Sequence, residues 1–282
     1  MLNLKDLGKS LLVGGVVMAG LVGCGKAGNQ AALTAGTNGS IIGGEEATGR
    51  EDFAKHVVLL YNVGQGSICT ASILSDSILV TAAHCTDGPA SSMRVVFGTD
   101  IEGDDKIVQK VVSYEVSALW AFRSDEAVNA GDISVVRFSG GLPAGYEPAS
   151  ILKKTELLST GATVLLAGYG NDNGAEHSGS GKLRFVETTI KDGGFSESEI
   201  LIEQSKGKGA CHGDSGGPAF VKVNGKWALW GVTNRGVNDP NNDCSVSAAY
   251  ASIPYYRDWV TKTARELNAG TTGNNMRVAN GQ

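Results

Sequence analysis

Short apolar runs rich in β-branched residues follow one another along most of the chain, with Gly, Asn and Asp turn signals between them. Runs of this kind predict strands. We expect strands over residues 56–61, 67–74, 77–82, 93–97, 107–116, 133–138, 163–167, 183–190, 219–223, 227–232 and 247–251. Because no helical crossovers are predicted between them, the pattern favours closed antiparallel barrels or a large sandwich over a parallel sheet.

Two local patterns mark a turn and a helix. Asn224-Gly225 lies between two apolar runs, and this pair readily adopts the two positive φ angles of a type I′ hairpin turn. One helix is expected from about Pro254 to just before Gly270. Its apolar face consists of Tyr256, Val260, Ala264 and Leu267.

Composition excludes several classes of protein. Of the 282 residues, 41% are hydrophobic and 19% are charged, which is unlike a disordered polyelectrolyte or an integral membrane protein. The formal charge of −5 argues against a phosphate-binding surface, so no nucleic-acid partner is expected. The 40 glycines show no G-X-Y period, which excludes a collagen helix.

The N-terminus predicts export. Lys5 and Lys9 precede an apolar run over residues 11–22, which suits a signal peptide and is too short to span a bilayer. The end of this run resembles the lipobox of bacterial lipoproteins, which implies cleavage after residue 23, lipidation of Cys24 and a lipid anchor in the cell envelope. The alternative is an ordinary signal peptide with a chance cysteine near its end, and the chain is exported or secreted in either case.

Beyond the leader, composition divides the rest of the chain. Residues 24–40 are rich in Gly, Ala, Thr and Asn without an apolar period, and we interpret them as a flexible propeptide or linker. The globular domain is expected over residues 41–270, followed by a flexible tail over 271–282.

Three motifs carry residue types that suit nucleophilic catalysis. TAAHC ends at Cys85 and contains His84, GDISVV contains Asp132, and CHGDSGGP contains Ser215. Glycines around Ser215 permit a tight turn, with the N–H groups of Gly213 and Ser215 available to bind an oxyanion. Each motif alone has a structural explanation as a packed histidine, a cap or a turn. Together, in this order, they favour catalysis.

With these motifs the chain resembles the chymotrypsin/trypsin family of serine peptidases, from Ile41 to about Leu267. The resemblance implies two six-stranded antiparallel barrels with a C-terminal helix. It also implies that Ser215 is the nucleophile, His84 the general base and then acid, and Asp132 the residue that orients His84. No cofactor is expected.

Three other acidic residues are candidates for the carboxylate that orients His84. Asp104, Asp105 and Asp125 lie in Gly-rich or charged loops without a following apolar strand, so Asp132 is favoured. Asp100, Glu102, Asp104 and Asp105 resemble a calcium-binding loop of some family members, although a solvated loop is the simpler interpretation.

The cysteines support the resemblance. With Cys24 set aside, four remain and permit three pairings. The family pattern implies Cys69 with Cys85 and Cys211 with Cys244. Because Cys211-His212 has no paired ligand motif, no metal site is expected.

The start of the globular domain implies activation by cleavage. Ile41-Ile42-Gly43-Gly44 resembles the mature N-terminus of the family, whose α-amino group pairs with the Asp before the catalytic Ser, here Asp214. The resemblance therefore implies a zymogen that is cleaved between Ser40 and Ile41. Family members commonly carry Arg or Lys where this chain has Ser40, which argues against a trypsin-like activator.

The resemblance also predicts an uncharged specificity pocket. Gly209 stands six residues before Ser215, where trypsin-like members hold an Asp. The expected substrate-binding residues are Gly209, Ala210, Asn234, Arg235, Gly236 and Ala248. Such a pocket favours apolar P1 side chains over Lys or Arg. In the family an aromatic residue is frequent at the position of Arg235. Residues 237–243 form an insertion relative to the family pattern.

The sequence therefore predicts an exported, monomeric serine endopeptidase that acts on peptides or proteins. Two alternatives remain open at this point. One is a catalytically silent binding protein on the same fold, and the other is a serine esterase.

Overall fold

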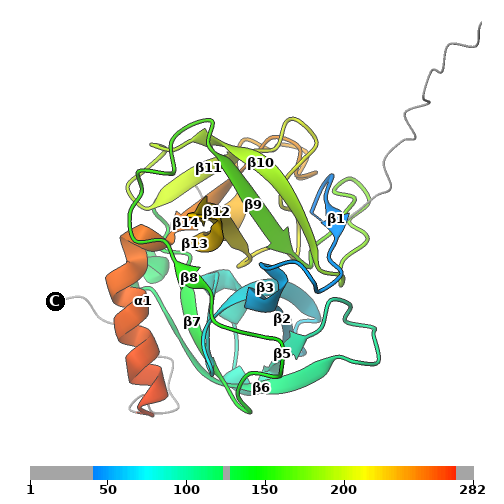
Figure 1. Cartoon of the computed structure of the whole chain (residues 1–282), viewed down its shortest axis with the longest axis vertical. Helices are drawn as coiled ribbons and strands as arrows, with labels where there is room; N and C mark the ends of the chain where they lie inside the picture. The colour runs from blue at the N-terminus through cyan, green and yellow to red at the C-terminus, as the bar shows by residue number, and fades with distance from the viewer. Residues whose placement is uncertain (1–40, 123–127, 271–282) are drawn as a thin grey trace, which may run out of the picture. The chain divides into compact units, whose positions relative to one another are not determined.

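The computed structural model describes residues 41–122 and 128–270 (Figure 1). The predicted signal peptide, Cys24, the propeptide with Ser40, the C-terminal tail and Asp125 lie outside the described residues. None of the helices in the described part is both long and apolar enough to cross a membrane.

Six antiparallel strands close the first barrel in the order β2-β3-β4-β7-β6-β5. They are β2 (Val57–Asn62), β3 (Ser67–Ser75), β4 (Ile78–Thr81), β5 (Met93–Phe97), β6 (Ile107–Val116) and β7 (Ser134–Phe138). Short 3₁₀ helices lie between or before these strands: η1 (Ala54–His56), η2 (Ala83–Thr86), η3 (Ala90–Ser92) and η4 (Ala118–Phe122). The predicted strands of this half are confirmed, with shifts of one residue at several ends.

The second barrel closes in the order β9-β10-β11-β14-β13-β12, with β12 pairing back to β9. Its strands are β9 (Thr163–Gly168), β10 (Arg184–Asp192), β11 (Glu199–Glu203), β12 (Pro218–Val223), β13 (Lys226–Gly236) and β14 (Ser247–Ser252). Two short strands attach to it: β1 (Glu45–Glu46) pairs with β10, and β8 (Ser150–Ile151) pairs in parallel with β13. The prediction of two six-stranded barrels is thus confirmed.

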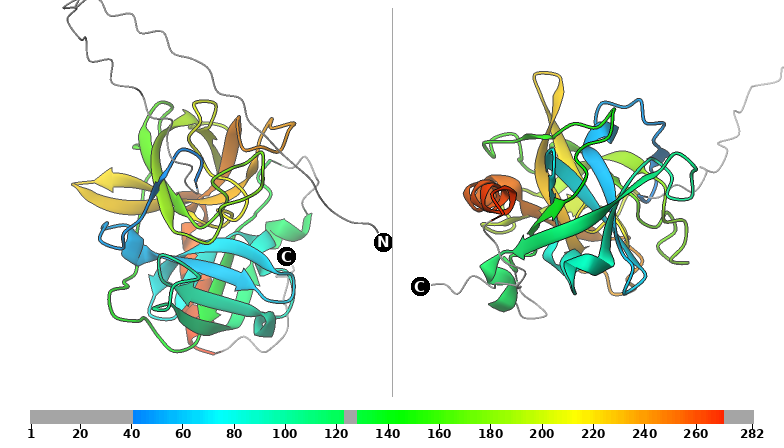
Figure 2. Two further views of the ribbon diagram at one scale, coloured as in Figure 1. Left: turned by 90° about the vertical axis from the view of Figure 1, so that its right-hand side faces the viewer. Right: turned by 90° about the horizontal axis from the view of Figure 1, so that it is seen from below.

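The predicted hairpin turn and helix are also present. Asn224 and Gly225 have φ angles of 51° and 80°, as a type I′ turn between β12 and β13 requires. Helix α1 (Ile253–Asn268) buries Tyr256, Val260 and Leu267 against strands of both barrels, and the right-hand view of Figure 2 looks along it.

Strand β11 was not predicted from the sequence. Its apolar run is only three residues long and begins after Glu199, yet the Glu199 side chain is almost completely buried. The carboxylate accepts two hydrogen bonds from the guanidinium of Arg235 on β13, at 2.7 and 3.0 Å. A charged residue fits inside the barrel here because its partner lies on another strand, which a local pattern does not reveal.

The core has two parts. One cluster of buried side chains fills the first barrel and continues beneath α1. The other fills the second barrel around Trp230 and Tyr250, and it includes Ile41. Side chains therefore fill the interiors of both barrels, and the functional site is formed by loops at the ends of the barrels.

Candidate active site

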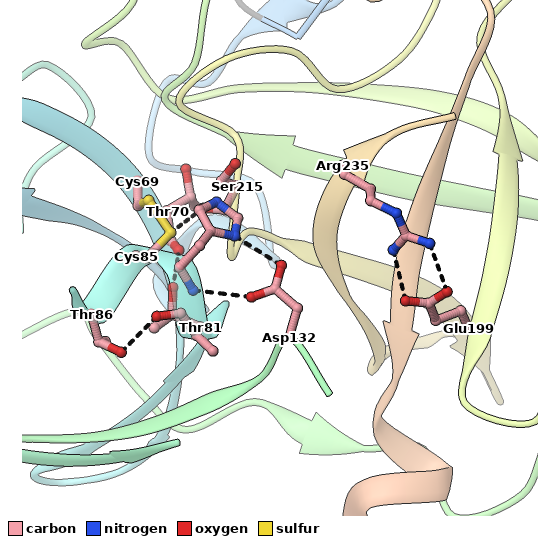
Figure 3. Close-up of polar contacts among 11 residues, drawn as sticks. Cys69, Thr70, Thr81, Cys85, Thr86, Asp132, Glu199, Ser215 and Arg235 are labelled. Carbon is pink, nitrogen blue, oxygen red and sulfur yellow. Dashed lines mark hydrogen bonds and ion pairs between the residues drawn. A yellow bond between two sulfur atoms is a disulfide. The ribbon is translucent and has the colours of Figure 1, made fainter. Parts of the chain in front are cut away.

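His84 and Asp132 meet between η2 and the start of β7. The backbone N–H of His84 donates to Oδ1 of Asp132 at 3.0 Å, and Nδ1 of the ring lies 2.8 Å from Oδ2 (Figure 3). The carboxylate thus holds both the backbone and the ring. Because a carboxylate only accepts, this contact places a proton on Nδ1, and in the neutral ring the lone pair is then on Nε2.

The two partners differ in exposure. The side chain of Asp132 is 6% exposed, whereas that of His84 is 35% exposed. The backbone of Asp132 is also braced: the side-chain amide nitrogen of Asn234 donates to the Asp132 carbonyl at 3.1 Å and to the Val232 carbonyl at 3.0 Å. Asn234 lies at a register shift between β13 and β14, where an irregular strand changes the direction of a side chain.

The competing acidic residues lie elsewhere. Glu102, Asp104 and Asp105 are exposed in the turn between β5 and β6. Of the carboxylates weighed for this role within the described residues, the structure brings Asp132 to His84.

Ser215 is positioned by contacts from both barrels. Its carbonyl accepts a hydrogen bond from the N–H of Thr70 on β3 at 2.8 Å, and it lies 3.5 Å from Sγ of Cys85, the residue after His84. The next residue, Gly216, donates its N–H to the Thr233 carbonyl at 2.8 Å. These contacts place Ser215 against the segment that carries His84, and Figure 3 labels Ser215 beside Thr70 and Cys85.

The turn before Ser215 points the N–H of Gly213 away from Asn171. The carbonyl of His212 accepts a hydrogen bond from the N–H of Asn171 at 2.7 Å. Because the C=O and N–H of a trans peptide point in opposite directions, the N–H of Gly213 faces away from Asn171. Gly213 has a φ of 94°, which favours glycine, and a Cβ there would lie 2.8 Å from Cα of Gly170.

Thr70 was not singled out from the sequence, yet it connects the parts of this turn. Its buried hydroxyl donates to the Gly213 carbonyl at 3.0 Å and accepts from the N–H of Tyr169 at 3.1 Å. Together with its backbone contact to Ser215, this residue fixes the turn on two sides.

Asp214 belongs to the same turn, and its side chain is buried beneath it. Its carboxyl oxygens accept hydrogen bonds from the N–H groups of Gly170 and Cys211, each at 2.8 Å. Burial raises the pKa of Asp214 to about 7, although both hydrogen bonds and the nearby Arg184 lower it. Ile41, the predicted partner, is buried in the core of the second barrel.

A cavity of about 250 Å³ opens beside Ser215. Of the predicted substrate-binding residues, Ala210, Asn234, Arg235, Gly236 and Ala248 line it. Gly209 lies outside this lining, and Gln204 lines it instead. The insertion contributes Asp239 and Asn242, which the sequence analysis did not assign to the pocket.

Two charged groups in the lining have partners. Arg235 is paired with Glu199, as Figure 3 shows. Oδ2 of Asp239 accepts from the N–H of Cys244 at 2.7 Å.

Both expected disulfides are present, Cys69–Cys85 beside His84 and Cys211–Cys244 in the wall of the cavity. In the described chain, the two groups of cysteine and histidine close enough to share a metal ion use their sulfurs in these bridges.

Comparison with known proteins gives a consistent result. A family model described as Trypsin matches residues 41–260. Trypsin alpha of Drosophila erecta is 30% identical over 249 residues, which cover 82% of this chain and 90% of that protein. Chymotrypsin-like elastase family member 1 of Macaca fascicularis is 26% identical over 243 residues, covering 80% and 90%. Brachyurin of Leptuca pugilator is 27% identical over 229 residues, covering 78% and 96%.

Proposed function

Because the chain belongs to the trypsin family and is a serine-type endopeptidase, we propose that Ser215, His84 and Asp132 carry out its hydrolysis of peptide bonds. The two-point contact between Asp132 and His84 is the observation that carries this proposal. It fixes the imidazole tautomer that leaves Nε2 able to accept a proton.

The reaction proceeds in two stages. Oγ of Ser215 attacks the carbonyl carbon of the scissile peptide while Nε2 of His84 takes the hydroxyl proton. The N–H groups of Gly213 and Ser215 bind the negative charge on the carbonyl oxygen. The amine then leaves with the proton from His84, and an acyl ester remains on Ser215. Water hydrolyses this ester, with His84 again taking the proton and returning it to Oγ.

Asp132 contributes through charge and position. Its carboxylate stabilises the imidazolium that forms when His84 is protonated, and it keeps the ring from rotating. The brace from Asn234 to the Asp132 backbone supports this role.

The cavity beside Ser215 is proposed to receive the P1 side chain. It holds no carboxylate at residue 209, and Ala210 and Ala248 narrow it with methyl groups. These features support a preference for apolar P1 residues over Lys or Arg. On a panel of chromogenic peptides that differ only at P1, faster cleavage after Arg than after Ala, Val, Leu or Phe would contradict this preference and implicate Asp239.

Activation is proposed to occur by cleavage between Ser40 and Ile41. The new α-amino group would pair with the buried Asp214, which lies directly below the turn that carries the oxyanion donors. N-terminal sequencing of active protein tests this step, and full activity in protein that begins at Cys24 would refute it.

Export with a lipid anchor at Cys24 is part of the same proposal, so cleavage at Ser40 would also release the enzyme from the envelope. The two disulfides support an oxidising compartment. The mass of membrane-extracted protein, with and without Cys24→Ser, tests the anchor. An unlipidated wild type would exclude it.

The decisive experiment for catalysis is labelling with a fluorophosphonate, followed by a peptide-library cleavage profile. We expect wild-type protein to be labelled and Ser215→Ala to remain unlabelled, because the reagent reacts with an activated serine. No labelling of correctly processed wild type would indicate a catalytically silent binding protein. Labelling without peptide cleavage would indicate an esterase.

A further inference from the structure

We propose that Gln204, and not residue 209, forms the floor of the P1 pocket and restricts it to small and medium-sized uncharged side chains. This inference rests on the proposed function, in which Ser215 is the nucleophile and the adjacent cavity receives P1. Gln204 follows β11 directly, is 2% exposed, and lines the cavity together with Ser215.

The Gln204 amide is held at both ends. Its Nε2 donates to the Cys244 carbonyl at 2.7 Å, and its Oε1 accepts from the N–H of Ala210 at 3.1 Å. The side chain therefore bridges the two segments of the pocket wall that the Cys211–Cys244 disulfide also joins. A buried amide with bonds at both ends has little freedom to move aside for a substrate.

Gln204 and Gly209 fit each other closely. A Cβ placed on Gly209 would overlap Cγ and Cδ of Gln204. Glycine at 209 is thus the residue that leaves room for the glutamine. The absence of a side chain at 209 does not deepen the pocket, because Gln204 occupies that space.

This floor has two consequences for the substrate. A neutral amide offers no negative charge to a Lys or Arg side chain, and desolvating a cation without a counter-ion is costly. The amide also takes up depth that a Phe side chain would need, so Ala and Leu should be preferred to Phe. Arg235 in the lining is paired with Glu199, and Asp239 binds the Cys244 N–H through Oδ2. Because a hydrogen bond does not remove the charge of a carboxylate, cleavage after Arg would implicate Asp239 rather than the amide floor.

The test compares kcat/KM for peptide substrates with Ala, Leu, Phe or Arg at P1 and identical residues elsewhere. Gln204→Ala should open the floor and raise the Phe/Ala ratio by at least about tenfold, the scale at which pocket size discriminates. Gln204→Met fills the same space without the two hydrogen bonds, and its Phe/Ala ratio should stay near that of wild type.

A carboxylate introduced at residue 209 gives a second, independent test. Gly209→Asp alone should gain no cleavage after Arg, because its Cβ meets Gln204. Gln204→Ala combined with Gly209→Asp should gain it, by at least about tenfold over wild type.

Fluorophosphonate labelling of every variant separates the possible failures. An unlabelled wild type would refute the proposed function itself. Labelled variants with an unchanged Phe/Ala ratio in Gln204→Ala would refute only the role of Gln204. Equal Arg cleavage by Gly209→Asp and by the double variant would refute it as well.

Discussion

The two barrels contribute to the site in different ways. The first barrel presents two side chains, His84 and Asp132, whose contacts are made directly with each other. The second presents Ser215 on a turn whose backbone N–H groups are the proposed oxyanion donors. The peptide that carries the Gly213 N–H is held by Asn171, and the peptides on either side of the one that carries the Ser215 N–H are held by Thr70, two partners remote in sequence.

The two halves of the site therefore obtain their geometric precision from different kinds of contact. A side-chain pair is defined by two residues and tolerates change around it. A backbone arrangement depends on every buried group that holds a peptide plane in place, including groups that never touch substrate. The predictions below test this contrast, beginning with the side-chain pair.

Asp132→Asn should have the largest effect. The amide keeps the shape of the carboxylate but stabilises the wrong imidazole tautomer and removes the charge, so kcat should fall by about 10⁴-fold. Steady-state kinetics on one peptide substrate measures the change. Asp104→Asn, in the exposed turn between β5 and β6, is the matched control and should leave kcat unchanged. A similar loss in both variants would mean that His84 and Asp132 do not act as a pair.

Thr70→Val tests the backbone half of the comparison. It keeps the volume of the side chain but leaves the Gly213 carbonyl and the Tyr169 N–H without their partner. Because the turn then loses its fixed orientation, kcat should fall by roughly tenfold to a hundredfold while KM changes little. Thr70→Ser retains the hydroxyl and should restore most of the activity.

A matched control for Thr70 lies in β10. Thr188 is also buried, and its hydroxyl donates to the Glu203 carbonyl at 2.9 Å. Thr188→Val should lose comparable stability but keep kcat. If Thr70→Val behaves in the same way, Thr70 has only a structural role, and the turn keeps its orientation without it.

The same contrast explains what the sequence could predict. His84, Asp132 and Ser215 each lie in a short motif, so residue type and order were enough to propose them as a set, and the structure brings His84 and Asp132 into contact. The strands of the first barrel were also predictable, because each is an apolar, β-branched run bounded by turn signals.

Thr70 and Gln204 were not predictable. Thr70 contacts Gly213 across 143 residues of sequence, and Gln204 contacts Cys244 across 40. Neither contact has a local signal, since a buried Thr or Gln is recognised only by the partner that satisfies its hydrogen bonds. The same holds for Glu199, whose partner Arg235 allows a charged residue to sit in a buried strand.

The smallest effect expected is on how the free energy of unfolding of the uncleaved chain depends on pH. One buried titratable group in each barrel contributes to it, and the two contributions change in opposite directions as the pH rises. In the second barrel, burial raises the pKa of Asp214 from 3.8 to about 7. The native state then binds a proton that the unfolded state has released. The contribution of Asp214 to the free energy of unfolding is therefore present below about pH 4 and is lost as the pH rises to about 7.

In the first barrel, the contribution of His56 to the free energy of unfolding changes with pH in the opposite direction. Burial lowers its pKa from 6.5, and its Nδ1–H donates to the Glu147 carbonyl at 2.8 Å. The unfolded state binds a proton more readily than the native state, so this contribution is present above about pH 6.5 and is lost as the pH falls through the lowered pKa.

Urea unfolding of the uncleaved Ser215→Ala chain between pH 4.5 and 8 separates these two contributions, because that variant cannot cleave itself. Adding Asp214→Asn should make stability rise more steeply with pH than in the parent. Adding His56→Asn should make it rise less steeply. Cleaved protein gives the sharpest contrast. An α-ammonium paired with Asp214 would lower the pKa of that carboxyl, so its titration would fall below pH 4.5 and its contribution to the slope between pH 4.5 and 8 should disappear. The same slope difference before and after cleavage would mean that the new N-terminus does not reach Asp214.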